Sequence, residues 1–346
     1  MTHGAMWVMH NAPFDALHLA TLDDRYTVEE LMQHVTDTQI LAHLIDPRER
    51  VDGGIGHGLK ELCAHYVDPE SPDGQSALKA RFKELGLKHS EGFAKIPIDD
   101  ETFVRYAGLD VILTARLLPQ LLVQIKPSVS PLIDFEHQVQ RITTAMTARG
   151  MRVDSNYALG LLHDLEEERL QASEDALRYG VANVNSTKQV ADALIERGVV
   201  LTDRTPSGQF KVDKQILSRL DDPLAVAVLT AKEASKASSS WVTPLIEHAQ
   251  VDGRAHCRIK TLAARTSRMS ISNPPLQQLP SNDHRIRTCL IADEGQLLVA
   301  CDFKQIEFRV LASLSQEKHM IDAILNGQDL HDMTASRLFG NDFTSK

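Results

Sequence analysis

Residues 302–316 read DFKQIEFRVLASLSQ and overlap the end of the apolar run GQLLVACDF at residues 295–303. The apolar run predicts a buried β-strand, and the residues after it have the apolar spacing of a helix. Asp302 would then stand at the carboxyl end of a strand, where a rigidly held carboxylate suits Mg²⁺, with the Phe303 carbonyl as a second oxygen ligand. Taken alone, however, an Asp at a strand end is more often a helix cap or a turn residue.

Two flanking segments make residues 302–316 more informative. They are TSRMSISNPPLQQLP at residues 266–280 and GQDLHDMTASRLFG at residues 327–340. In chain order, the three segments resemble the motifs TGRLSSxxPNLQNIP, DYSQIELRVLAHLS and xxDIHxxTAxxVFG of family A DNA polymerases, the DNA polymerase I family. Because all three occur in the family's order, the resemblance is specific.

The resemblance implies nucleotide-binding roles around Asp302. Asp302 would be a metal-binding carboxylate of the polymerase site, with the Phe303 carbonyl beside it. Gln305 and Glu307 would bind the incoming nucleotide, Glu307 by packing against its sugar and excluding a 2′-hydroxyl. His331 would contact the nucleotide phosphates.

Upstream of this region, the resemblance implies that Arg268 and Gln277 contact the minor groove at the primer-template end, where acceptors on every correct base pair look alike. Three residues depart from the family pattern. Phe303 replaces a tyrosine and removes its hydroxyl, Lys304 replaces a small serine and adds a charge, and Pro275 replaces an asparagine.

The charge distribution is compatible with DNA binding. The net charge of −10 by itself argues against a nucleic-acid partner, whose binding surface is normally basic. Residues 232–287, however, carry nine Lys and Arg against four Asp and Glu, which is a local net charge of +5. This basic block contains Arg268 and lies between acidic flanks, so it could neutralise the DNA backbone.

Residues 134–250 resemble the thumb of the same family. NSTKQVADALIERG at residues 185–198 matches its NxSTKQLxxxLF pattern, and KASSSW at residues 236–241 matches its KLxSTY pattern. The resemblance implies DNA contacts from four side chains, which are Lys188, Lys236, Ser239 and Ser240. A helix-capping box at Ser186 and a chance serine cluster would explain the same letters without DNA.

The N-terminal third has three candidates of its own. Asp15 follows HNAPF, and Tyr106 and Asp110 lie four residues apart, which places them on one helical face. Together, ahead of a thumb-like region, they resemble motifs II and III of the tyrosine-bearing 3′–5′ proofreading exonucleases, which are RNase H-like. This implies that Asp110 binds a metal ion, that Asp15 supports a second ion, and that Tyr106 orients the attacking water.

The fold expected is an α+β and α/β multidomain protein with three parts. These are a partial RNase H-like exonuclease domain at 1–126, a mostly α-helical thumb at 127–258 and the first half of a polymerase palm at 259–346. Within them, the apolar spacing predicts a buried strand at 5–10, helices at 27–46, 57–67, 100–122, 213–220 and 223–248, and helices ending at Gly150, Gly180 and Gly198.

Two expected parts of such an enzyme are not found in the sequence. An exonuclease DxE motif is not seen before Asn11, and a Lys/Arg-bearing fingers helix is not seen before Lys346. We therefore expect a fragment of a polymerase, with polypeptide segments missing at both ends, that neither extends nor excises a primer alone. The expected cofactor is Mg²⁺ in incomplete two-metal sites, and the expected partners are primer-template DNA and deoxynucleoside triphosphates.

Other classes of function remain open or are disfavoured. A non-catalytic DNA-binding remnant or accessory protein that keeps the thumb is the main alternative. A phosphohydrolase built on His331-Asp332 is disfavoured because suitably spaced partner histidines are absent from the sequence. With four scattered cysteines and no long uninterrupted apolar run, we expect no membrane partner, and we expect the bacterial cytoplasm, cellular or phage-infected, as the location.

Overall fold

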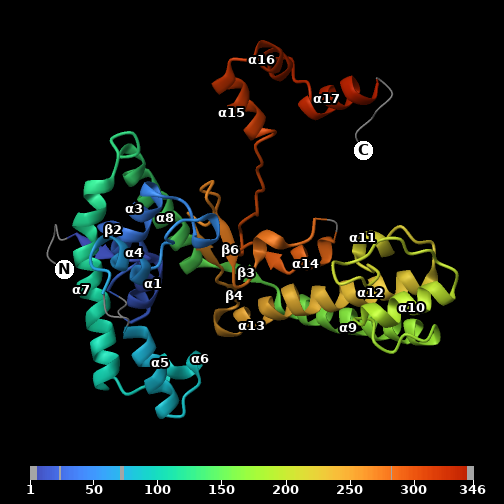
Figure 1. The fold of residues 1–346 in the computed structure, drawn as a ribbon, viewed down its shortest axis with the longest axis horizontal. Helices are drawn as coiled ribbons and strands as arrows, with labels where there is room; N and C mark the ends of the chain where they lie inside the picture. The colour runs from blue at the N-terminus through green and yellow to red at the C-terminus, as the bar shows by residue number, and fades with distance from the viewer. Residues whose placement is uncertain (1–5, 23–24, 71–73, 282, 341–346) are drawn as a thin grey trace. The chain divides into compact units, whose positions relative to one another are not determined.

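The computed structural model describes residues 6–22, 25–70, 74–281 and 283–340 (Figure 1). The chain divides into two compact units, Met1–Ala292 and Asp293–Lys346. Helices dominate both units, and three small sheets lie in the first. The predicted mixed α and β class is confirmed at this level, while the bounds of the three predicted domains remain predictions.

The first unit begins with a small parallel sheet covered by helices. Its elements are β1 (Trp7–Met9), α1 (Ala12–Leu22), α2 (Val28–Met32), β2 (Val35–Asp37), α3 (Thr38–Ile45), α4 (Leu59–Tyr66), α5 (Gly74–Glu84), α6 (His89–Lys95) and α7 (Glu101–Gln124). The long helix α7 packs against α3, α4 and α5 (Figure 1), with Leu113, Leu117 and Leu121 buried. Asp100 caps α7 and accepts from the amides of Thr102 and Phe103, as the acids at its start predicted.

Two predictions in this region need correction. The single helix predicted at 27–46 is wrong, because β2 (Val35–Asp37) separates α2 from α3. Residues Val35–Asp37 pair in parallel with Trp7–Met9, and these inter-strand hydrogen bonds outweigh the local helical spacing. The strand predicted at 5–10 forms as β1, but Trp7 and Val8 are 39% and 37% exposed rather than buried.

The middle of the unit is almost entirely helical. Its elements are α8 (Pro131–Arg149), β3 (Met151–Val153), α9 (Ser155–Arg178), α10 (Thr187–Glu196), α11 (Lys214–Leu217), α12 (Pro223–Ala237), the π-helical turn η2 (Ser238–Val242) and α13 (Thr243–Asp252). Helices α9 and α12 lie side by side (Figure 1) over a core of leucine, valine and alanine. The helix predicted at 223–248 is thus interrupted by a π-turn.

Helix α8 connects this helical part to the N-terminal sheet. We expected it to begin the thumb, yet it packs against α1, α2 and α3. At Ser186, only half of the predicted capping box forms. The Ser186 hydroxyl accepts from the Gln189 amide at 3.3 Å, but the Gln189 side-chain oxygen accepts from the amide of Asn183 at 3.0 Å.

Short strands join distant parts of the first unit. After α13 the chain forms β4 (Arg254–Ala255), β5 (Arg258–Lys260), β6 (Ser270–Ser272), the turn η3 (Leu276–Gln278), the helix α14 (His284–Thr288) and β7 (Leu290–Ile291). β3 pairs antiparallel with both β4 and β7, and β5 pairs antiparallel with β6. The chain on either side of α9 to α13 is therefore held together by β3.

The second unit contains α15 (Ile306–Ser315), α16 (Lys318–Leu325) and α17 (Leu330–Phe339). The buried strand predicted at 295–303 is wrong. This segment forms no strand, and Leu297 and Val299 are 89% and 81% exposed. A strand needs a neighbouring backbone for its hydrogen bonds, and the structure describes no strand in this unit that could supply one. The helix predicted after Asp302 does form, as α15.

One helix has the length and composition of a membrane span. Helix α7 is long and apolar enough to cross a membrane, and 22% of its apolar window is buried. The helix also contains Arg105, Asp110 and Arg116, and charged side chains are costly at the centre of a bilayer. Since α7 packs through one face against α3, α4 and α5, this is weak evidence for a membrane helix.

Gly150 ends α8 as predicted, and it allows the chain to turn tightly into β3. Its φ of 64° and ψ of 177° lie in a region open essentially to glycine, and an added Cβ would lie 2.9 Å from His256 and 3.1 Å from the Ala255 carbonyl oxygen. Gly150→Ala is expected to lower the free energy of unfolding by about 1–3 kcal/mol in urea titrations. Gly160→Ala is the control. A Cβ added at Gly160, inside α9, would meet no atom within 4 Å apart from the nearby backbone of its own helix, so this variant is expected to stabilise slightly. Equal destabilisation by both variants would contradict this account.

Candidate metal centres and nucleic-acid interface

The three N-terminal candidates lie on two helices. Asp15 is in the first turn of α1, and Tyr106 and Asp110 are one turn apart on α7. A fourth residue, Lys60 of α4, joins them: its ammonium forms an ion pair with Asp110 Oδ1 and lies 5.5 Å from the centre of the Tyr106 ring. No motif in the sequence points to Lys60, because the pairing depends on how α4 packs against α7.

Several carboxylates influence the ionisation of their neighbours in this region. Burial is the main cause of the raised pKa of Asp15, and the negative charges of Asp37 and Asp110 raise it further. Nearby His10 has a lowered pKa, mainly through burial, which the charges of Asp37 and Asp110 oppose. Asp110 therefore lies close enough to Asp15 to affect its ionisation, while the exonuclease roles of both residues remain predictions.

Asp37 is the acid in this region that the sequence analysis missed. It is completely buried at the end of β2. Oδ1 accepts from the amides of Asn11 and Gln39 at 3.0 and 2.8 Å, and Oδ2 accepts from the Ala12 amide at 2.8 Å and the Gln140 side chain at 2.7 Å. Its position inside the helix predicted at 27–46 concealed that Asp37 ends a strand and caps α3. Because all its contacts are structural, Asp37 has little capacity left to bind a metal.

This region offers few ligands to a metal ion. Within the ranges that the structure describes, no group of three His, Cys, Asp or Glu side chains is arranged to hold one. Asp15 and Asp110 remain, and Lys60 already neutralises Asp110. These residues do not by themselves fit two divalent ions, which require several oxygen ligands each.

In the second unit, one carboxylate joins two of the sequence motifs. Asp329 Oδ1 accepts from the Gln305 side chain at 2.7 Å and from the His331 amide at 2.8 Å, and so caps α17. The ring of His331 meets that of Phe308 edge-on, with centroids 5.0 Å apart. The predicted nucleotide-binding residues Gln305 and His331 are therefore brought together, through an aspartate that the sequence analysis did not select.

The remaining predicted residues of this unit are exposed. Asp302 and Phe303 lie on the irregular segment before α15, and Glu307 is on the first turn of α15. The ammonium of Lys304, a departure from the family pattern, lies 4.0 Å from Asp329 Oδ2, so its charge is partly balanced by that carboxylate.

The predicted thumb residues lie on the helical part of the first unit. Lys188 is exposed in the first turn of α10. Lys236 is exposed at the end of α12, with its ammonium 5.3 Å from the centre of the Trp241 ring. The π-turn η2 carries Ser239, which is exposed and donates to the Ser235 carbonyl at 2.8 Å, and Ser240, which is half-buried. Since π-turns are frequent at functional sites, this geometry is compatible with a binding role.

The two predicted minor-groove residues are both exposed. Arg268 precedes β6, and Gln277 lies in η3. The Gln277 side chain accepts from the Ile271 amide at 3.2 Å and donates to the Met269 carbonyl at 3.4 Å. Contact with a base pair would therefore require the Gln277 side chain to exchange these internal hydrogen bonds.

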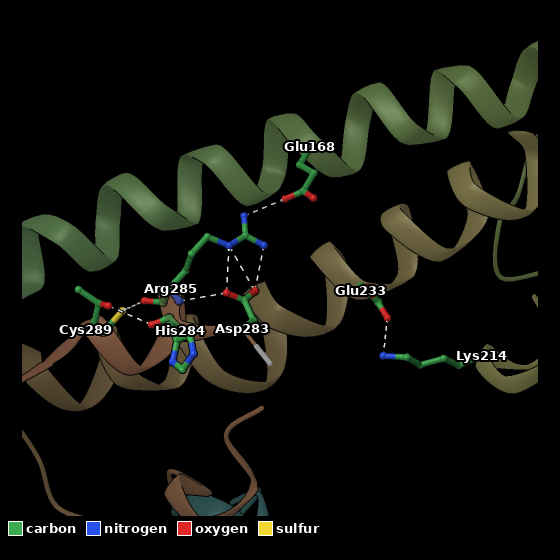
Figure 2. Close-up of polar contacts among 8 residues, drawn as sticks. Glu168, Lys214, Glu233, Asp283, His284, Arg285 and Cys289 are labelled. Atoms are coloured by element: carbon green, nitrogen blue, oxygen red, sulfur yellow. Dashed lines mark hydrogen bonds and ion pairs between the residues drawn. The ribbon is translucent and has the colours of Figure 1, made fainter. Parts of the chain in front are cut away.

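The basic block is partly neutralised within the protein. Figure 2 shows Arg285 donating to Asp283 and, across to α9, to Glu168 at 3.1 Å. Hydrogen bonds to Asp283 and then to Glu168 raise the pKa of Arg285 against the opposing effect of burial. Lys260 likewise lies 3.7 Å from Glu49. The formal local charge of +5 thus overstates the charge available to DNA.

Comparisons with known proteins agree with the motifs. The family model "DNA polymerase family A" matches residues 157–345, and the "3′-5′ exonuclease" model matches residues 2–126. The chain is 38% identical to the DNA polymerase of Mycobacterium phage L5, covering 95% of the chain and 56% of that protein. It is 31% identical to DNA polymerase I of Synechocystis sp., covering 97% of the chain and 33% of that protein.

The solved structures include a similar fold. The POL domain of Pol1 from M. smegmatis, solved in complex with DNA primer-template and dNTP, has a TM-score of 0.70 and 25% sequence identity. The match covers 97% of this chain and 54% of that one. The chain spans about half the length of the mycobacteriophage polymerases: the match covers 56% of the L5 protein and 57% of the D29 protein.

Proposed function

The chain belongs to DNA polymerase family A, and from that membership we propose that it acts as, or within, a DNA-directed DNA polymerase with a 3′–5′ exonuclease domain. The substrates are deoxynucleoside triphosphates and primer-template DNA, in replication or repair, and the location is the bacterial cytoplasm. The observation that carries the proposal is the likeness, over 97% of this chain, to a polymerase domain solved with primer-template DNA and dNTP.

The proposed domain roles follow the predicted boundaries. Residues 1–126 form the RNase H-like exonuclease part, residues 127–258 the thumb and residues 259–346 the first half of the palm. The parallel pairing of β1 with β2 supports the first assignment, and the α9–α12 helix pair supports the second. The packing of α8 against α1, α2 and α3 indicates that the first two parts are closely joined.

In the palm part, Gln305, Glu307 and His331 bind the incoming nucleotide. The contact of Gln305 and His331 with one carboxylate, Asp329, supports this role because it holds the two motifs together. Polymerases and exonucleases of these families generally use divalent metals. We assign Mg²⁺ to Asp302 and the Phe303 carbonyl, which supply only part of a coordination sphere.

In the DNA interface, four thumb side chains contact the phosphate backbone: Lys188, Lys236, Ser239 and Ser240. Two further residues, Arg268 and Gln277, contact the minor groove. The exposure of all but the half-buried Ser240 supports the assignment. Phosphate contacts fix position without reading sequence, which suits an enzyme that must act on any primer.

DNA binding by this interface can be tested by charge removal. Lys188→Ala and Lys236→Ala are each expected to weaken binding of a fluorescent primer-template, and to reduce the slope of log K against log salt by roughly 1, because each removes one phosphate contact. Fluorescence anisotropy between low and moderate salt measures both quantities. Lys95→Ala, an exposed lysine of α6 paired with Glu91, is the matched control. Binding that is unchanged in both thumb variants would contradict the proposed interface.

A second candidate function is a DNA-binding protein without catalysis. The observation that favours it is the ion pair of Lys60 with Asp110, together with the small number of available carboxylates. Both candidates bind DNA, so they are separated by chemistry. The chain is therefore assayed alone and joined to the remaining part of a phage L5-type polymerase, of which it spans 56%. Template-directed incorporation in either form that is lost in Asp302→Asn supports the polymerase, whereas DNA binding without incorporation in both forms supports the alternative.

A further inference from the structure

Lys60 is held in place by the buried contact between α4 and α7. Leu62 and Cys63 of α4 and Leu113 and Leu117 of α7 belong to one core cluster and are each at most 3% exposed. Cys63 Sγ lies 3.7 Å from the Leu113 carbonyl oxygen. Because Lys60 is one turn before Cys63, this packing places it on the side of α4 that faces α7.

The Lys60 ammonium has two partners on α7. It forms an ion pair with Asp110, and it lies 5.5 Å from the centre of the Tyr106 ring, within the range of a cation–π contact. The side chains of Lys60 and Asp110 are only 26% and 31% exposed. The lysine therefore contacts both of the α7 residues that the sequence analysis assigned to the exonuclease site.

A divalent ion that competes with Lys60 for Asp110 would gain little from the neighbouring acid Asp37. Asp37 is occupied by four internal donors, so its carboxylate has little capacity to help bind an ion at Asp110. A divalent ion at Asp110 would find no cluster of three ligands in the described part of the chain. It would also be repelled by the ammonium.

We propose that Lys60 is the resident cation of this site in this chain, and that its ammonium competes with a divalent ion for Asp110. An ammonium can balance a carboxylate or a phosphate, but it does not generate a metal-bound hydroxide. The inference rests on the proposed exonuclease assignment of Asp110.

The test is a Mn²⁺ titration of the full chain, with free Mn²⁺ measured by electron paramagnetic resonance. All proteins carry Asp302→Asn, which removes the candidate metal-binding carboxylate of the second unit. Lys60→Met is expected to tighten Mn²⁺ binding roughly tenfold, because it frees Asp110 and removes a nearby like charge. Lys60→Gln is expected to do the same, and Lys60→Arg, which keeps the charge, is expected to remain near the parent affinity.

Two controls locate the effect. Adding Asp110→Asn to Lys60→Met is expected to abolish the gain, and Lys95→Met, on the exposed face of α6, is expected to produce none. The proposal is overturned if neither Lys60→Met nor Lys60→Gln tightens Mn²⁺ binding, or if the gain survives Asp110→Asn. Circular dichroism verifies that each variant is folded. Primer-template binding by the parent chain tests the proposed function separately, since the Mn²⁺ titration contains no DNA.

Discussion

Asp37→Ala is expected to lower the free energy of unfolding of the first unit by about 3–5 kcal/mol. The carboxylate is fully buried, and its loss leaves four donors without an acceptor, two of them buried and two part-buried. Three of these are the amides of Asn11, Ala12 and Gln39, at the starts of α1 and α3. The fourth is the Gln140 side chain, through which α8 is attached to the N-terminal sheet.

Urea unfolding followed by circular dichroism measures this loss. Asp37→Asn is expected to be less damaging than Asp37→Ala, because the amide oxygen can still accept some of the same bonds while its NH₂ group faces donors. Glu91→Ala, which removes an exposed carboxylate paired with Lys95, is the control and is expected to change stability by less than about 1 kcal/mol. A similar, small effect of Asp37→Ala would show that these donors find other partners.

The second large effect is a dependence of stability on pH that originates at His43. This residue of α3 is 4% exposed, and neither of its ring nitrogens has a hydrogen-bond partner. Burial, followed by the neighbouring charges of His57 and Lys260, lowers its pKa from 6.5 to about 4, although Glu49 and Asp46 oppose the shift. His43 is therefore neutral in the folded protein at pH values where the unfolded chain already binds a proton.

The sign of the effect follows from this difference. Above pH 6.5 neither state is protonated at His43. As the pH falls from 6.5 to 4 only the unfolded state gains a proton, so stability is lost. Over this window the loss approaches about 3 kcal/mol. Asp46, whose pKa is lowered to about 2 mainly by its hydrogen bonds to Arg48, acts in a separate and more acidic window.

His43→Phe is expected to remove most of this pH dependence. The ring borders a cavity of about 710 Å³, which leaves room for the slightly larger side chain. Comparing urea unfolding at pH 7.5 and 4.5 for parent and variant measures the difference. His163→Phe, an exposed position on α9, serves as the control and should retain the parent's slope. If His43→Phe keeps the full acid sensitivity, the source lies at other groups.

Local sequence signals predicted many individual elements correctly. The acids before α7 predicted its start at Asp100, Gly150 predicted the end of α8, and Ser186 caps α10. Such signals succeed because a cap or a left-handed glycine acts within a few residues of its own position. Motif order was also sufficient to predict the family, which the family-model matches confirmed.

The errors in the fold occurred where distant partners decide the structure. Residues 35–37 have helical spacing on both sides, but they form a strand because Trp7–Met9 lies beside them. Residues 295–303 are as apolar as a buried strand, but they remain irregular and exposed in a unit whose described part holds no strand. A strand, unlike a helix, cannot satisfy its own backbone, so apolar composition alone does not establish one.

For the candidate sites, the sequence by itself determined the family, the order of its parts, and the residue types available for chemistry at Asp15, Asp110 and Asp302. Only the tertiary structure decided which charges those residues meet. Lys60 reaches Asp110 across fifty positions of sequence, and Arg285 is neutralised by Glu168 across more than a hundred. Electrostatic energy depends on distance in space and on burial, and both are properties of the packed chain rather than of the order of its residues.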